Sequence, residues 1–170
     1  MTKVIVTGPE SSGKTTLCKQ LSEQFKIPFT EEFSRKYIDN LDREYLQEDL
    51  VIIAKGQMKN EQLTRSNKHL SLHDTDLITL KIWSESKYGN CNDWIISQIE
   101  KQKQEERFYF LCSPDIPWEE DPQRENPNNR EVLFESYKKE LIQLRYNYFI
   151  IEGGNRLENS IKKITELISR

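Results

Sequence analysis

Residues 8–15 read Gly-Pro-Glu-Ser-Ser-Gly-Lys-Thr and match the phosphate-binding pattern G-x-x-x-x-G-K-[ST] between a predicted strand and a predicted amphipathic helix. Gly8 and Gly13 permit backbone conformations that a side chain would penalise, so successive N–H groups can turn toward an anion. Lys14 can reach the β- and γ-phosphates, and the Thr15 hydroxyl can ligate Mg²⁺. We therefore expect ATP and Mg²⁺ to bind here, the nucleotide through Gly8, Glu10, Ser11, Ser12, Gly13, Lys14, Thr15 and Thr16.

Two carboxylates, Asp74 and Asp76, follow an apolar segment that predicts a strand over residues 70–74. A carboxylate at such a strand end can hold Mg²⁺ directly or through its waters. We assign Asp74 to the metal, together with Thr15, and to the reacting site; we assign Asp76 to the acceptor side. Asp74 or Thr75 could equally begin the next helix as its cap, and both roles can hold at once.

A second acidic position, Glu31-Glu32, lies at the end of the second extended segment in the chain, residues 29–33. A kinase of small hydroxyl compounds needs a carboxylate that orients or deprotonates the attacking hydroxyl, and Glu32 is the candidate for that role. Arg35 lies one helical turn further on and can pair with Glu32 or contact the substrate. The alternative is a solvated acidic pair.

Residues 113–129 are rich in Pro, Asp, Glu and Asn and lack apolar periodicity. Loops of this length in a compact domain are usually functional or disordered, so we expect a lid over about residues 113–130. Its arginines, Arg124 and Arg130, would meet the transferring phosphoryl group unless both face solvent. Trp118 in this segment and Tyr88 in another loop are candidates to stack on a flat acceptor ring, and the alternative for Trp118 is packing of the loop on the body of the protein. Trp83 and Trp94 follow helical patterns and are expected in the core.

Composition limits the remaining possibilities. The chain has 170 residues and a net charge of −3, which predicts one domain over residues 1–170 and no general attraction to nucleic acid or to an anionic membrane. Three widely spaced cysteines fit a reducing, cytoplasmic setting rather than a zinc or disulfide framework, with Cys18 and Cys112 expected in the core. No segment is long and apolar enough to span a bilayer, and the first strand leaves no room for a signal peptide.

Strands are expected at residues 4–6, 70–74, 107–112 and 148–151, and residues 29–33 form either a short strand or an extended entry to a helix. Helices are expected over residues 14–25, 34–41, 48–66, 77–86, about 94–99, 131–144 and 157–168. This alternation predicts an α/β, three-layer P-loop NTPase fold, with a central parallel five-stranded sheet, helices on both faces and a lid segment. Ligands of such sheets gather at the carboxyl ends of the strands, where all the clusters above are placed. Residues 153–156 follow the last strand and are a candidate for the adenine side. His69 and His73 have no metal-site spacing, and neither is assigned a catalytic role.

The motifs together resemble one known family over nearly the whole chain. They are the ten residues 8–17, Glu32-Phe33-Ser34-Arg35, Asp74-Thr75-Asp76, Tyr88-Gly89, and Pro117-Trp118 before Arg124. This set is similar to the ribosylnicotinamide kinase domain of NadR-type proteins, which belong to the P-loop kinase-like superfamily. The resemblance implies ATP-dependent phosphorylation of nicotinamide riboside to nicotinamide mononucleotide in NAD metabolism.

By the same resemblance, Lys14 and Thr15 bind phosphate and Mg²⁺, Glu32, Arg35 and Asp74 line the reacting site, and Arg124 and Arg130 belong to the lid. Glu31 stands where the family is expected to carry an aromatic residue. The chain would be a stand-alone kinase domain with a small-molecule acceptor, and self-association stays open. The alternatives are a kinase of another nucleoside, a nucleotide-gated regulatory ATPase, and an NTPase acting on nucleic acid, which the negative charge disfavours.

Overall fold

A five-stranded parallel sheet in the order β2-β3-β1-β4-β5 forms the centre of the molecule in the computed structural model, which describes residues 1–64 and 70–169. Its strands are β1 (Thr2–Thr7), β2 (Phe29–Thr30), β3 (Leu70–Asp74), β4 (Arg107–Cys112) and β5 (Asn147–Ile151). The predicted sheet is confirmed. Residues 29–33 combine the two expected alternatives, because Phe29 and Thr30 form a short strand and the chain then enters a helix at Phe33.

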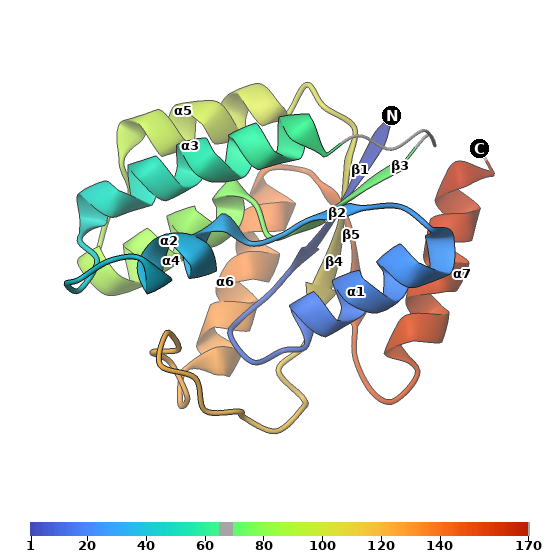
Figure 1. Ribbon diagram of the computed structural model, residues 1–170. Helices are drawn as coiled ribbons and strands as arrows, with labels where there is room; N and C mark the ends of the chain where they lie inside the picture. The colour runs from blue at the N-terminus through green and yellow to red at the C-terminus, as the bar shows by residue number, and fades with distance from the viewer. Residues whose placement is uncertain (65–69, 170) are drawn as a thin grey trace.

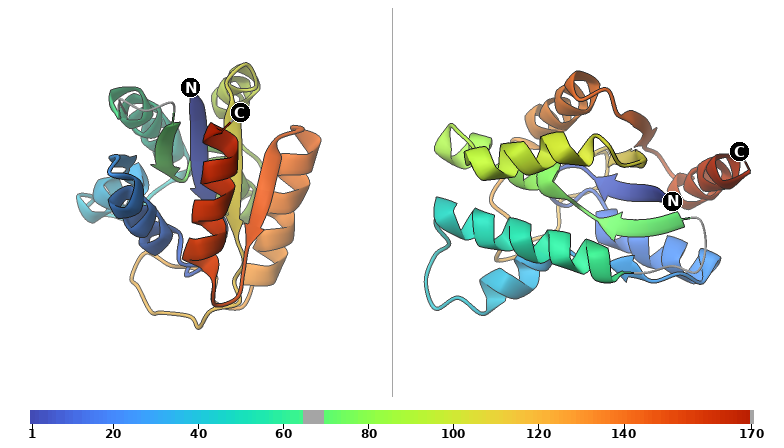
Figure 2. Two further views of the ribbon diagram at one scale, coloured as in Figure 1. Left: turned by 90° about the vertical axis from the view of Figure 1, so that its right-hand side faces the viewer. Right: turned by 90° about the horizontal axis from the view of Figure 1, so that it is seen from above.

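Helices cover both faces of the sheet, as Figures 1 and 2 show. They are α1 (Lys14–Phe25), α2 (Phe33–Asp39), α3 (Gln47–Leu63), α4 (Leu77–Tyr88), α5 (Asp93–Gln102), α6 (Arg130–Gln143) and α7 (Arg156–Ile168). α1 and α7 lie on one face and α3 to α6 on the other, which confirms the three layers. The last two residues of the predicted helix 48–66 lie outside the described residues. Within residues 1–64 and 70–169, no helix is long and apolar enough to cross a membrane.

The strands are buried on both faces because each side of the sheet has its own apolar cluster. Ile5 and Tyr109 pack toward α3 to α6, whereas Val4 and Phe110 pack toward α1 and α7. This arrangement explains why β1 and β4 read as continuous apolar runs rather than as alternating patterns. The cysteines are buried and free, in agreement with the expectation for Cys18 and Cys112, and burial raises the pKa of Cys112 to about 12.

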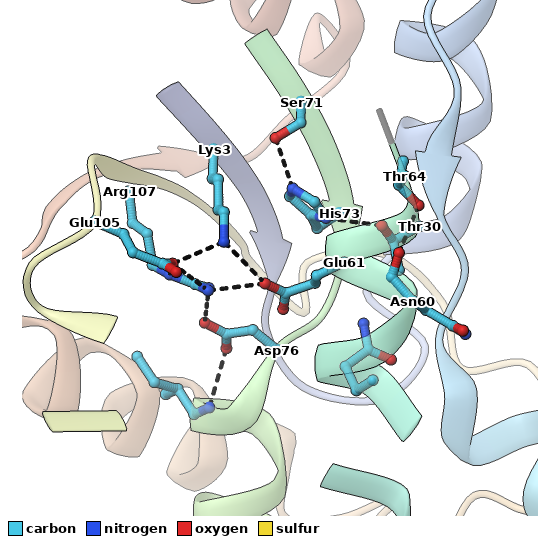
Figure 3. A network of polar contacts seen from close by, with 12 residues as sticks. Lys3, Thr30, Asn60, Glu61, Thr64, Ser71, His73, Asp76, Glu105 and Arg107 are labelled. Carbon is cyan, nitrogen blue, oxygen red and sulfur yellow. Dashed lines mark hydrogen bonds and ion pairs between the residues drawn. The ribbon is translucent and has the colours of Figure 1, made fainter. Parts of the chain in front are cut away.

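A buried cation begins β4, where sequence reasoning expected only an apolar strand. The fully buried Arg107 guanidinium lies 2.8 Å from Glu61, 3.1 Å from Asp76 and 2.7 Å from Glu105 (Figure 3). Burial raises the pKa of Glu61 and of Asp76, and the positive charge of Arg107 opposes that rise. The network therefore joins α3, α4 and β4 on one side of the sheet.

A buried histidine lies beside this network in Figure 3. Thr30 contacts Nδ1 of His73 and Ser71 contacts Nε2, each at 2.8 Å. Burial and the nearby positive charges lower the pKa of His73 to about 3, so the ring is neutral near pH 7. His73 thus has a structural role inside the protein. His69 lies outside the described residues.

We expect the substitution Arg107→Leu to destabilise the fold by about 3–5 kcal/mol, because it leaves Asp76 buried without a cation and Glu61 with only the more distant Lys3, at 3.6 Å. Carboxyl groups whose pKa is higher in the folded state bind protons more readily when folded, so lowering the pH favours folding. The loss should therefore be smaller at pH 5 than at pH 8. Urea unfolding at both pH values measures it, with Lys103→Gln, from an exposed ion pair, as the control. A loss equal to that of the control would contradict this account.

Candidate active site

The loop after β1 has the backbone that the phosphate motif requires. Gly8 has φ of +135°, and a Cβ there would lie 2.6 Å from the carbonyl oxygen of Cys112 at the end of β4. Gly13 has φ of +81° and is the N-cap of α1, where it offers no side chain to occupy the first N–H groups of the helix. Unoccupied N–H groups at a helix N-terminus attract anions. The loop is therefore built to receive phosphate.

The polar side chains of the loop contact its own backbone. Ser12 donates a hydrogen bond to the Pro9 carbonyl oxygen at 2.7 Å, and the Lys14 ammonium donates to the same oxygen at 2.8 Å. Lys14 thus lies over the loop, on the side where the phosphates of a bound nucleotide would meet it. Glu10 and Ser11 instead contact residues 113–130: the Glu10 carboxylate accepts hydrogen bonds from the backbone N–H groups of residues 125 and 126, and the Ser11 hydroxyl oxygen accepts one from the Glu119 N–H.

Thr15 and Asp74, the two predicted metal ligands, meet directly. The Thr15 hydroxyl donates to Asp74 Oδ2 at 2.6 Å. The other oxygen, Oδ1, is buried and has no hydrogen-bond partner among the described residues. Burial, together with the negative charge of Glu32, raises the pKa of Asp74 to about 6. An orphaned carboxylate oxygen beside a hydroxyl fits a hard cation that prefers oxygen ligands, as Mg²⁺ does.

The structure contradicts the assignment of Asp76 to the acceptor side. Asp76 is fully buried, and its Oδ1 caps α4 by accepting the Ile78 N–H at 3.0 Å. Its Oδ2 accepts hydrogen bonds from Arg107 and from the Tyr109 hydroxyl. The two oxygens are thus used inside the network of Figure 3, and Asp76 does not line the cavity beside the loop. The residue that caps α4 is therefore Asp76, whereas the alternative stated from the sequence placed the cap at Asp74 or Thr75.

Glu32 and Arg35 lie on the same cavity as the phosphate loop. Glu32 is the N-cap of α2, and its carboxylate accepts a hydrogen bond from Ser34 at 2.7 Å. Arg35 lies 3.9 Å from Glu32 and forms a closer ion pair, 2.9 Å, with Asp121. Both suggested partners of Arg35 are therefore compatible with its position, and Glu32 keeps one carboxylate oxygen near the cavity.

The predicted lid segment, residues 113–130, crosses the phosphate loop along the lower side of the molecule in Figure 1. Arg124 lines the cavity and contacts the Ser11 hydroxyl at 3.4 Å. Arg130 does not line it, because its guanidinium donates to the carbonyl oxygens of Ser11 and Ile116. Arg130 therefore joins the base of the segment to the loop, which corrects the expectation that both arginines face the reacting phosphoryl group.

The cavity has a volume of about 180 Å³ and lies between the phosphate loop, α2, α4, α6 and the lid segment. Two aromatic side chains line it, Trp83 from α4 and Tyr137 from α6. The expectation that Trp83 belongs to the core is thus wrong in part. One face of α4 carries Thr79, Trp83 and Ser86 at helical spacing. The two hydroxyl residues on the same face as Trp83 were the signal in the sequence that this face borders a cavity.

The two aromatic residues predicted to stack on the acceptor do not line this cavity. The Trp118 ring lies between two guanidinium groups, 5.9 Å from Arg124 and 5.7 Å from Arg130. Tyr88 ends α4, and its hydroxyl donates to the Tyr45 carbonyl oxygen at 3.3 Å. Both rings stabilise the walls of the site instead of facing its interior.

Residues 153–156 lie behind the phosphate loop. Arg156 donates to the carbonyl oxygens of Ser12 and Ser113, at 2.8 and 2.9 Å, and pairs with Asp115. The Gly153 N–H donates to the same Asp115 carboxylate at 2.6 Å. This cluster fixes the entry to α7 against the loop, and its role toward adenine stays a prediction.

We expect Asp74→Asn to abolish the strengthening of ATP binding by Mg²⁺, because an amide lacks the charge that holds the cation. Isothermal titration should give an ATP affinity in Mg²⁺ at least about tenfold weaker than that of the unmodified protein. With EDTA present, the two proteins should bind ATP equally, or the variant more tightly, because a negative charge near the phosphates is gone. An undiminished effect of Mg²⁺ in the variant would exclude Asp74 as a ligand.

The family described as "AAA domain" matches residues 3–158. The chain is 24% identical over 121 residues to the trifunctional NAD biosynthesis/regulator protein NadR of Salmonella typhimurium (strain LT2), covering 68% of this chain and 29% of that protein.

Two crystal structures share the fold. NadR protein in complex with NR superimposes with a TM-score of 0.79 at 23% identity, over 99% of this chain and 52% of that one. NadR protein in complex with NAD and AMP-PNP gives a TM-score of 0.70 at 21% identity, over 99% and 50% of the two chains. The chain thus spans about half the length of these crystallised proteins and less than a third of the curated relative.

Proposed function

The chain belongs to the AAA domain family, and from that premise we propose that it is an ATP-dependent small-molecule kinase whose acceptor is nicotinamide riboside. The observation that carries the proposal is one cavity lined by the phosphate loop, Glu32, Arg124 and the aromatic wall of α4 and α6. The likeness to NadR, including its complex with NR, supports the choice of acceptor. We treat residues 1–170 as one kinase domain, acting in the cytoplasm in NAD salvage.

In the proposed reaction, the loop N–H groups and Lys14 hold the triphosphate. Thr15 and Asp74 would hold Mg²⁺, which would supply positive charge against the phosphates. Glu32 orients the 5′-hydroxyl of the riboside and accepts its proton as the oxygen bonds to the γ-phosphorus. The bond from that phosphorus to the β–γ bridging oxygen breaks in line, and ADP leaves. Arg124 stabilises the charge that spreads over the phosphoryl oxygens.

Trp83 and Tyr137 form the proposed wall for the acceptor ring. Nicotinamide riboside carries a pyridinium cation, and indole is the side chain that attracts cations most strongly through its face. These rings come from α4 and α6, whereas Glu31, before the catalytic carboxylate, is exposed. The chain would thus supply its aromatic contacts from other elements than the second strand.

We expect Trp83→Leu to raise the KM for nicotinamide riboside about fivefold or more, because a desolvated cation–π contact is worth about 1–2 kcal/mol. The ATP affinity should stay within about twofold, since the indole N–H bonds to Glu125 and not to the phosphate loop. Initial rates at saturating ATP measure the change, with Trp94→Leu as the matched control because Trp94 does not line the cavity. Equal KM values for the two variants would show that the acceptor ring does not bind against Trp83.

The decisive test is a coupled assay of ADP release with nicotinamide riboside, with the mononucleotide product identified by mass spectrometry. We expect turnover, and we expect Lys14→Met to lose at least about a hundredfold in kcat/KM with an unchanged circular dichroism spectrum. Turnover only with a different nucleoside would overturn the acceptor and keep the kinase. ATP binding without turnover of any acceptor would favour the regulatory alternative.

A further inference from the structure

The tip of the lid segment, Glu125 and Asn126, is held by contacts that the proposed chemistry does not use. The Glu125 carboxylate accepts hydrogen bonds from the Tyr45 hydroxyl and the Lys87 ammonium, both at 2.7 Å, and from the Trp83 indole at 3.4 Å. Glu125 does not line the cavity, so it does not contact the acceptor there. We call Tyr45, Trp83 and Lys87 the socket of this carboxylate.

The socket is built rather than incidental. The Lys87 ammonium lies 3.8 Å from the centroid of the Tyr45 ring, and the Tyr45 and Trp83 rings lie 4.9 Å apart. Burial tends to raise the pKa of Glu125, but the hydrogen bonds from Lys87 and Tyr45 outweigh it and lower that pKa. Burial, followed by the hydrogen bond to Glu125 and the negative charge of that carboxylate, raises the pKa of Tyr45. The carboxylate is therefore ionised and the phenol neutral near pH 7, as the hydrogen bonds require.

The backbone of the same tip is held from the opposite side. Glu10 Oε2, from the phosphate loop, accepts the N–H groups of Glu125 at 3.0 Å and of Asn126 at 2.9 Å. The tip thus connects the loop that grips phosphate to α4, which carries the acceptor wall. Trp83 takes part in both, because its indole lines the cavity and its N–H points to Glu125.

We propose that Glu125 is a positioning residue, and that docking of its carboxylate in the Tyr45–Trp83–Lys87 socket closes the lid segment for phosphoryl transfer. Docking holds the neighbouring Arg124 against the cavity and keeps water out of it. Water is the competing acceptor: its oxygen bonds to the γ-phosphorus, the bond to ADP breaks, and inorganic phosphate is released. The proposal rests on the proposed function, because it assigns Glu125 to the same transfer.

The test compares Glu125→Gln and Lys87→Met with a matched pair, Glu135→Gln and Lys138→Met, which removes an exposed ion pair of α6. We expect Glu125→Gln to lower the kcat of transfer about three- to tenfold and to raise phosphate release without acceptor by a similar factor. The ratio of hydrolysis to transfer is the informative quantity, because a merely destabilised fold would lower both rates together. The double variant Glu125→Gln/Lys87→Met should be no worse than either single variant, since the two groups act as one pair.

Hydrogen–deuterium exchange tests the same proposal in a measurement that needs no acceptor. In Glu125→Gln, amides of residues 124–126 should exchange several-fold faster with Mg-ATP bound, while those of β1 and β4 keep their rates. An unchanged hydrolysis-to-transfer ratio, or unchanged exchange at the tip, would overturn the role of Glu125. If the unmodified protein transfers phosphate to no nucleoside, the proposed function fails on that result alone; phosphate release and exchange then still decide whether Glu125 closes the segment.

Discussion

The position of β1 between β3 and β4 is the constraint on which the site depends. In the sheet register, Val6 pairs with Asp74 and Thr7 with Leu111, so the phosphate loop begins beside the ends of both neighbouring strands. The Thr15–Asp74 contact and the close approach of Gly8 to Cys112 follow from this register. A slip of β3 by one residue would exchange the faces of its side chains and remove the Asp74 carboxylate from the loop.

The loop also organises the segment that covers it. Ser11 has a left-handed φ of +51°, and its polar atoms make several contacts with the lid segment. Its hydroxyl accepts the Glu119 N–H, the same oxygen lies near Arg124, and its carbonyl oxygen accepts from Arg130. Together with Glu10, the loop therefore offers one surface to phosphate and another to residues 113–130. Movements of the lid segment and of the loop cannot be independent while these bonds persist.

The sequence was most informative where local spacing dictates geometry. The glycine positions, Lys14, Thr15 and the alternating strands and helices follow from short motifs, and the structure has them as predicted. The role of Asp76 and the aromatic wall did not follow. Asp76 and Arg107 are 31 positions apart, so nothing local distinguishes a metal-side carboxylate from one that neutralises a buried arginine. Trp83 looked like a core residue because helical periodicity does not say which neighbour a face meets.

Under the proposed function, the charge balance in the cavity favours a divalent cation beside the triphosphate. Each carboxylate near the loop already has partners: Glu10 has lid amides, Glu32 has Ser34, and Asp74 has Thr15. The cations are also engaged, since Lys14 contacts Pro9 and Arg124 contacts Glu119. A triphosphate must draw Lys14 and Arg124 from neutral carbonyl oxygens, which charge-assisted bonds favour. It would also approach the Asp74 carboxylate, and a divalent ion between the two converts that repulsion into attraction.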